Sequence, residues 1–176
     1  STALLLLLCT GFRRGEASEL KWENVNLDDC LIEVVSNAVV VKGKGVVVKD
    51  PKTEGSARTI QIPEVLCDRL MEYKNWYYEQ KRIMGERWNE NEGHLFINLD
   101  TGKRIYPTTM LNWVNKVLGK AGLGHWTNHS MRHTNITLKL YNGVPLIEVS
   151  GDAGHSRTST TTDIYSHYLK TRRSAG

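Results

Sequence analysis

The stretch "LIEVVSNAVVVKGKGVVVKDPK", residues 31–52, limits the possible folds of this chain more than any other segment. Together with "ARTIQIP" at residues 57–63 it concentrates Val and Ile, which favour strands, and it is broken by Gly-Lys-Gly and by "TEGS". We predict three short antiparallel strands here, the last two joined by a loop around residues 52–56. A chain with so little further strand signal cannot be an all-β protein.

Helices are predicted on both sides of this β segment. The apolar run at residues 3–9 predicts a buried helix that ends at Gly11, a residue suited to a left-handed C-cap. Pro63 suits a first helical position, and the apolar stripe behind it has helical spacing: Leu66, Leu70, Tyr73 and Tyr77. Further helices are expected at about residues 14–21, from 108 to a stop at 119, at 129–142, from 145 and from 160, with a hairpin within residues 94–106.

Two threonines are expected to begin helices. Thr108 precedes an apolar stripe and can act as an N-cap, and Thr160 with Asp163 has the spacing of a capping box. The resulting fold class is α+β: a mostly helical domain around a small three-stranded antiparallel sheet. With 176 residues the chain forms one domain, and we expect it to be a fragment of a longer protein because it opens inside a helix.

Charge and cysteine content narrow the class further. The net charge of +4 favours an anionic partner. The three cysteines are odd in number, far apart and without a CxxC motif, so we expect a reduced, intracellular protein without a disulfide framework or structural zinc. The first apolar run is far shorter than the ~20 residues of a membrane span.

Four clusters contain residues that could take part in catalysis: "TGFRRGE" (10–16), "DPKTEGSART" (50–59), "HSMRH" (129–133) and "GHSRTSTTTDIYSHY" (154–168). Each alone has an ordinary explanation, as a surface arginine, a turn lysine, a helix cap or a packed tyrosine. Together they suit attack on a phosphodiester, because arginine binds two phosphate oxygens at once and a tyrosine can be the nucleophile. The chain has no carboxylate cluster for Mg²⁺ and no GxxxxGK[ST] motif for ATP.

The order and spacing of these clusters resemble the catalytic domain of tyrosine recombinases, the phage integrase family. "TGFRRGEASELKWENV" is similar to that family's first-arginine segment, "PKTEGSARTIQIP" to its β-hairpin lysine segment, and "HSMRHTNITLKLYNGV" to its His-x-x-Arg segment. "GHSRTSTTTDIYSHY" is similar to the closing segment that runs from Gly-His to the tyrosine. The resemblance covers nearly the whole chain and implies the fold of DNA breaking-rejoining enzymes.

The resemblance also implies roles for single residues. Arg13 and Arg132 would bind the scissile phosphate, Lys52 would be the general acid, and Tyr165 would be the nucleophile. His129 and His155 would assist at the phosphate, and Glu16 would hold structure near Arg13. Ala153 stands where the family usually has leucine before Gly-His, which could loosen the packing behind the histidine.

The same resemblance implies the partners. The expected partner is double-stranded DNA, cut and rejoined through a 3′-phosphotyrosine with no cofactor and no metal, by a tetramer of the full-length protein. Candidates for contact with the DNA backbone are Lys42, Lys44, Lys49 and Arg157.

Three alternatives stay open at this stage. The chain could be a DNA-binding module of the same fold without activity, or could cleave single strands like a type IB topoisomerase. His125, His129 and His133 recur every four residues and would form a metal-binding face if one helix carried all three.

Overall fold

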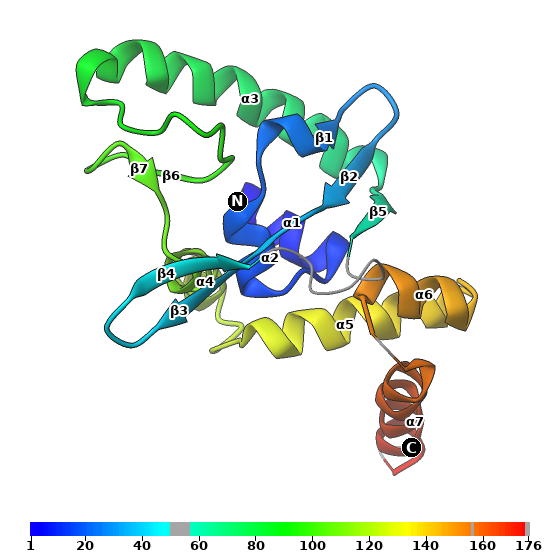
Figure 1. Cartoon of the computed structure of the whole chain (residues 1–176). Helices are drawn as coiled ribbons and strands as arrows, with labels where there is room; N and C mark the ends of the chain where they lie inside the picture. Colours follow the sequence, from blue (N-terminus) through cyan, green and yellow to red (C-terminus); the bar gives the residue numbers. More distant parts are fainter. Residues whose placement is uncertain (50–56, 156, 175–176) are drawn as a thin grey trace.

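The computed structural model describes residues 1–49, 57–155 and 157–174, and the side chains within these ranges except those of residues 49 and 167–174. Helices make up most of it (Figure 1): α1 Thr2–Thr10, α2 Arg14–Glu19, α3 Glu64–Met84, α4 Pro107–Lys120, α5 Asn128–Tyr141, α6 Leu146–Ala153 and α7 Thr158–Ser174. Short 3₁₀ turns lie at η1 Trp22–Asn24 and η2 Gly85–Arg87. No helix among the described residues has the length and apolar character needed to cross a bilayer.

Helix α1 lies at the centre of the fold. Its buried face includes Leu6 and Leu7, and the helix packs against α3, α4 and α5. It ends at Gly11, whose φ of 64° is the left-handed C-cap conformation expected from the sequence, and the Gly11 N–H donates to the Leu7 carbonyl at 3.0 Å. This turn directs the chain from the core into the segment that carries Arg13.

The strands form three small antiparallel sheets. They are β1 Val25–Asn26, β2 Leu31–Val34, β3 Asn37–Val41, β4 Gly45–Lys49, β5 Arg58–Gln61, β6 Ile97–Asn98 and β7 Lys103–Arg104. A three-stranded sheet is present, in the order β1-β2-β5, with Ile32 opposite Ile60 and Val34 opposite Arg58. The expected hairpin at residues 94–106 is confirmed as β6–β7.

The predicted strand pairing was wrong in one respect. The valine-rich run does not join the three-stranded sheet. Among the described strands, β3 and β4 pair only with each other, with Val39 opposite Val47, and they project as a separate hairpin (Figure 1). Gly43 and Gly45, at φ of 79° and 73°, make the tight turn that closes this hairpin locally. Consequently β5 pairs with β2 and brings its first residue, Arg58, toward the core.

Several helix starts also differ from the predictions. Helices α3 and α6 begin at Glu64 and Leu146, one residue later than expected, because Pro63 and Pro145 are their N-cap residues. Helix α4 begins at Pro107 with Tyr106 as N-cap, because proline fits the first helical position, so Thr108 lies inside the helix. Helix α7 begins at Thr158, two residues before the expected cap at Thr160.

The C-terminal helices form a layer beneath this core. Helix α5 lies along α1, α6 packs against α5 and β5, and α7 contacts both α5 and α6 before it extends away from the body (Figure 1). A small apolar cluster of Ile136, Val149 and Ala153, with Ile164 packed against it, joins the three helices. The C-terminal end of α6 therefore lies where α2, α5, α7 and β5 converge.

Candidate active site

Three arginines converge on the C-terminal end of α6. The carbonyl groups of residues 152–154 accept hydrogen bonds from Arg58, Arg132 and Arg13, in that order. The bond from Arg58 Nε measures 2.7 Å and the bond from Arg13 Nη2 measures 2.9 Å. The last carbonyls of a helix lack partners within the helix and carry its negative dipole end, so cations are stabilised there. The helix end thereby orients guanidinium groups that come from three separate segments.

Gly154 makes this convergence possible. Its φ of 60° is left-handed, and a Cβ at this position would lie 3.0 Å from Arg58 Nη1 and 3.3 Å from Arg13 Nη1. The left-handed backbone favours glycine here, and a larger residue would in addition crowd the ends of two arginine side chains.

Arg132 is the buried member of the group. Its side chain comes from α5, the residue is 6% exposed, and its Nη1 donates to the Gly11 carbonyl at 2.8 Å while Nη2 donates to the Ala153 carbonyl. Among the described residues it has no acidic partner in a salt bridge. Burial, followed by the charge of Arg13, lowers the pKa of Arg132 to about 10, so the group remains a cation at neutral pH.

Arg13 is the accessible member. It is the N-cap residue of α2, and its side chain is 45% exposed. The expected contact with Glu16 is present: Arg13 Nη1 donates to Glu16 Oε1 at 2.8 Å, and the Arg13 backbone N–H donates to Oε2 at 2.8 Å. An exposed guanidinium beside a buried one forms a surface site suited to an anion with several oxygens.

His155 lies beside these cations. Its Nδ1 is 2.9 Å from Oγ1 of Thr161, a fully buried residue in the first turns of α7. Burial, with the charges of Arg132 and Arg13, lowers the pKa of His155 to about 4. The imidazole is therefore neutral at pH 7, with one ring nitrogen that can donate a hydrogen bond to an anion bound next to it.

Tyr165 lies one helical turn beyond Thr161. Residues four apart share a face of an α-helix, so the half-buried Tyr165 is on the face of α7 that meets His155. Ile164 fixes this part of α7 through its packing against α5 and α6. No hydrogen bond joins Tyr165 to the three arginines in the part of the chain that the structure describes.

His129 lies at the solvent side of the same helix as Arg132. It is exposed in the first turn of α5, and its ring centroid lies 3.9 Å from that of His133. His125 precedes α5, which begins at Asn128, so one helical face cannot carry all three histidines. The only group of three potential metal ligands among the described residues is Glu19, Glu92 and His94, which includes none of the residues predicted for the site.

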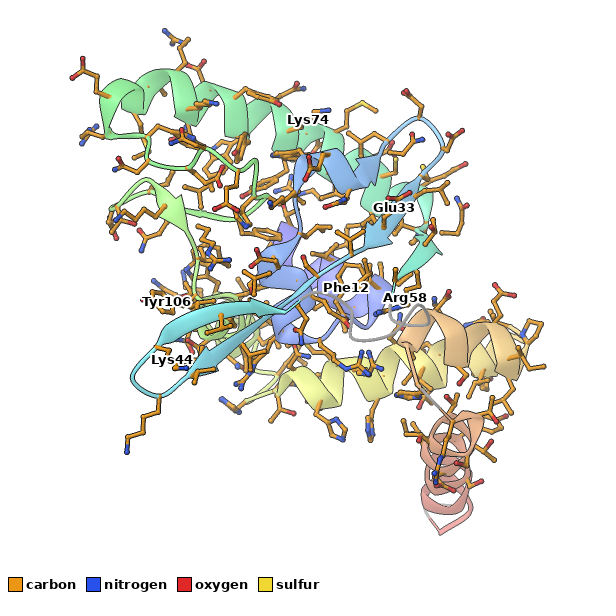
Figure 2. The ribbon with its side chains drawn as sticks, viewed as in Figure 1. Phe12, Glu33, Lys44, Arg58, Lys74 and Tyr106 are labelled. Atoms are coloured by element: carbon orange, nitrogen blue, oxygen red, sulfur yellow. The ribbon has the colours of Figure 1, made fainter. Side chains whose placement is uncertain are left out.

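The remaining predicted residues fall outside the cluster or outside the described residues. Lys42 and Lys44 are exposed at the tip of the β3–β4 hairpin, and Arg157 is exposed just before α7 (Figure 2 labels Lys44). Lys52 lies outside the described residues, and so does the side chain of Lys49. The structure thus brings together Arg13, Arg132 and His155 and places His129 and Tyr165 on the adjoining helices.

Arg58 is the site residue that the sequence prediction missed. It stands in the quoted segment 50–59, but only Lys52 was assigned a role there. A signal was available, because Arg58 is two residues before the buried Ile60 and so occupies the core face of its strand. A charged residue on a core face requires a buried partner.

A cluster of cations of this kind, here on a mostly helical domain with small antiparallel sheets, is suited to an anion with several oxygens. The chain matches the Phage integrase family over residues 1–172. It is 32% identical over 174 residues to a tyrosine recombinase XerC-like protein of Caldanaerobacter subterraneus subsp. tengcongensis, and 27% identical over 158 residues to the ICEBs1 integrase of Bacillus subtilis. These alignments cover 94% and 90% of this chain, but only 44% and 42% of the two relatives.

Solved structures show the same fold. The Tn1549 transposon integrase, determined in complex with transposon right end DNA, superposes with a TM-score of 0.75 at 21% identity, over 99% of this chain and 58% of that one. XerA recombinase superposes with a TM-score of 0.70 at 25% identity, over 91% of this chain and 49% of that one. The chain belongs to the phage integrase family, and it spans less than half the length of the two curated relatives named above.

Proposed function

We propose that this chain is the catalytic part of a site-specific recombinase that cleaves and rejoins double-stranded DNA through a 3′-phosphotyrosine intermediate. The observation that supports this most directly is the convergence of Arg13, Arg132 and His155 at the end of α6, next to the start of the helix that carries Tyr165. Family membership supports the same function.

In this proposal Arg13 and Arg132 bind the non-bridging oxygens of the scissile phosphate. Two guanidinium groups, those of Arg13 and Arg58, share the single carboxylate of Glu16, and Arg132 has no acidic salt-bridge partner among the described residues, so the site keeps an excess of positive charge. Fixed donors aimed at oxygens that gain charge in the transition state lower its free energy. His129 and His155 supply further hydrogen bonds at the same phosphate.

Tyr165 attacks the phosphorus. The bond from its phenolic oxygen to phosphorus forms as the bond from phosphorus to the 5′ oxygen breaks, and the phenolic proton is taken up by a neighbouring base or water. Lys52 gives a proton to the departing 5′ oxygen, which would otherwise leave as a strongly basic alkoxide. Attack of a 5′-hydroxyl on the phosphotyrosine reverses these steps, so neither ATP nor a metal is needed.

The proposed partner is duplex DNA, with the full-length protein acting as a tetramer. The exposed Lys42 and Lys44 at the hairpin tip, with Lys49 and Arg157, are proposed contacts to the DNA backbone. The Tn1549 integrase structure contains DNA, which supports the same class of partner for this chain. Such a protein works in the cytoplasm of a bacterial cell.

The test is covalent trapping on DNA. The protein is incubated with a pool of randomised, nicked duplexes, in which the short cleaved fragment diffuses away and religation fails. We expect a covalent protein–DNA product that Tyr165→Phe abolishes while DNA affinity is retained, because one hydroxyl is lost and no phosphate-neutralising charge. Adduct that persists in Tyr165→Phe, mapped to Tyr168, would contradict the assignment of the nucleophile.

Further measurements distinguish this function from a metal-dependent site, an inactive DNA-binding module and a topoisomerase. Adduct formation is expected to continue in excess EDTA, whereas a metal-dependent site would lose activity and regain it with a divalent ion. DNA binding without any adduct would indicate an inactive DNA-binding module. Relaxation of supercoiled plasmid without strand exchange between two duplexes would indicate topoisomerase-like cleavage.

A further inference from the structure

Arg58 is held at the boundary between the sheet and the candidate active site (Figure 2). It is the first residue of β5, opposite Val34 of β2, and its side chain is 10% exposed. Its guanidinium carbon lies 6.0 Å from the centre of the ring of the buried Phe12, within the range of a cation–π contact. Burial to this degree separates it from an ordinary surface arginine.

Every nitrogen of the Arg58 guanidinium donates to the protein. Nη1 and Nη2 donate to the two oxygens of Glu16 at 3.2 and 3.0 Å, and Nε donates to the Asp152 carbonyl at 2.7 Å. The paired bonds to one carboxylate form a fork, the strongest geometry for this pair of side chains. Arg58 therefore connects β5, α2 and the end of α6 through one rigid, planar group.

Glu16 passes this connection to Arg13. Each Glu16 oxygen accepts one hydrogen bond from Arg58 and one from Arg13, the latter both at 2.8 Å. Glu16 is buried, so its position depends on these four bonds and not on water. A shift of the carboxylate would displace the Arg13 side chain and its backbone together.

The fork to Glu16 argues against Arg58 as a phosphate ligand, because both of its terminal nitrogens are already paired with a carboxylate, whereas Arg132 has no acidic salt-bridge partner among the described residues. Resting on the proposed function, we propose that Arg58 is a positioning residue for DNA cleavage: it fixes Glu16, and through Glu16 it fixes Arg13 against the scissile phosphate. Through the Asp152 carbonyl it also holds the helix end that carries Gly154 and His155.

A positioning role predicts a change in the titration of Glu16. Burial alone would raise the pKa of this carboxyl, but hydrogen bonds and charge from Arg58 and then Arg13 lower it overall. The charged groups that face Glu16 are Arg58 from β5, Arg13 at the start of α2 and Arg132 from α5. Without Arg58 the desolvated carboxyl has less support for its charge, so its pKa rises. Protonated Glu16 cannot form an ion pair with Arg13.

The first experiment needs no DNA. The carbon-13 carboxyl signal of Glu16 is titrated in the wild type, in Arg58→Met and in Arg58→Lys. A matched control is Arg82→Met, since Arg82 forms an exposed pair with Glu79 on α3. We expect the Glu16 pKa to rise in Arg58→Met, to rise less in Arg58→Lys, which keeps the charge but not the fork, and to stay unchanged in the control. An unchanged Glu16 titration in Arg58→Met would overturn the proposal.

The second experiment measures adduct formation on the nicked duplex pool as a function of pH. We expect Arg58→Met to slow the reaction about 100-fold, the order of loss produced by small misplacements of catalytic groups, and to move its acid limb to higher pH. Arg58→Lys should recover part of the rate. Adding Arg58→Met to Glu16→Gln should cost little more, since both act through one contact. Additive losses with an unmoved acid limb would contradict the proposal.

The two experiments test the proposed function and the role of Arg58 separately. If the wild type forms no adduct, the proposed function is contradicted, while the Glu16 titration still decides whether Arg58 controls this carboxylate. If Arg58→Met shows no cooperative thermal unfolding and so is not folded, Arg58→Lys, which keeps the positive charge in β5, takes its place in both experiments.

Discussion

Arg132 on α5 donates a hydrogen bond to the carbonyl of Gly11, the residue that ends α1, at 2.8 Å. The other terminal nitrogen of the same guanidinium donates to Ala153 at the end of α6. One side chain thus ties together the ends of two helices that are far apart in the sequence. Its planar fork, and not only its charge, is what the position requires.

Replacement of Arg132 tests this requirement. We expect Arg132→Ala and Arg13→Ala each to slow cleavage by about 10²–10³-fold, as when a single transition-state donor is lost. Arg132→Lys should recover only part of the rate, because one ammonium cannot serve both carbonyls in the fixed geometry of the fork. Single-turnover adduct formation measures these rates, and full activity of Arg132→Lys would show that charge alone is sufficient.

Gly154→Ala should damage the site without removing any polar group. The left-handed backbone is expected to cost about 1–2 kcal/mol for a residue with a Cβ. The new methyl group would also lie 3.0 Å from Arg58 Nη1 and 3.3 Å from Arg13 Nη1, and would push both side chains from their partners. Chemical denaturation and adduct formation measure the two effects.

Gly143→Ala is the matched control for that change. Gly143 also has a left-handed backbone, with φ of 82°, but a Cβ there would meet no atom within 4 Å. We expect it to lose a similar amount of stability and to retain cleavage. Equal loss of cleavage in both variants would show that backbone strain, and not contact with the arginines, explains the result at Gly154.

The helices could be predicted because their signals are local. The apolar run before Gly11 and the stripe behind Pro63 each predict a helix, and both helices are present, α1 as expected and α3 with its start one residue after Pro63. The starts of α4 and α7 were misjudged because several neighbouring residues, among them Pro107 and Thr158, can begin a helix equally well.

The sheet and part of the site could not be predicted in the same way. Period-2 alternation in β2 and β5 does not say which strands pair, and the valine-rich run offered an equally good partner that instead folds back on itself. The fork between Arg58 and Glu16 joins residues 42 apart, so it is set by tertiary packing. Recognisable motifs predicted Arg13, Arg132 and His155, which the structure brings together, whereas Arg58 had only its place on the core face of a strand as a signal.

His155 should make the protein less stable in mild acid. Its folded pKa is about 4, below the ordinary value near 6.5, because of burial and the charges of Arg132, Arg13, His133 and Arg58. Between about pH 6.5 and pH 4 the unfolded chain therefore binds more protons than the folded one, and the free energy of unfolding falls as the pH falls. Denaturation over this window should show the decline, and His155→Gln should reduce it.

The contribution of His94 to stability has the opposite pH dependence, so it must be distinguished from that of His155 in this measurement. Two buried carboxylates, Glu90 and Glu19, contact its ring nitrogens and raise its pKa despite burial. Its contribution is fully present below about pH 6.5 and is lost as the pH rises through the raised value. Proton NMR of the imidazole signals distinguishes the two histidines. A His155 signal that titrates near its ordinary pKa would contradict the expected effect of the arginines.

The last prediction concerns Lys52 and the departing 5′ oxygen. If Lys52 protonates this oxygen, Lys52→Ala should be severely slow on ordinary DNA but much less impaired on a substrate with a 5′-bridging phosphorothiolate. Sulfur leaves as a stable thiolate and needs no proton, so the missing acid hardly matters. Arg132→Ala should show no comparable rescue, because its charge acts on the non-bridging oxygens whichever atom departs. Rates of adduct formation on the two substrates measure both ratios. Equal rescue of both variants, or of neither, would show that Lys52 only neutralises phosphate charge, as any lysine in a turn near DNA would.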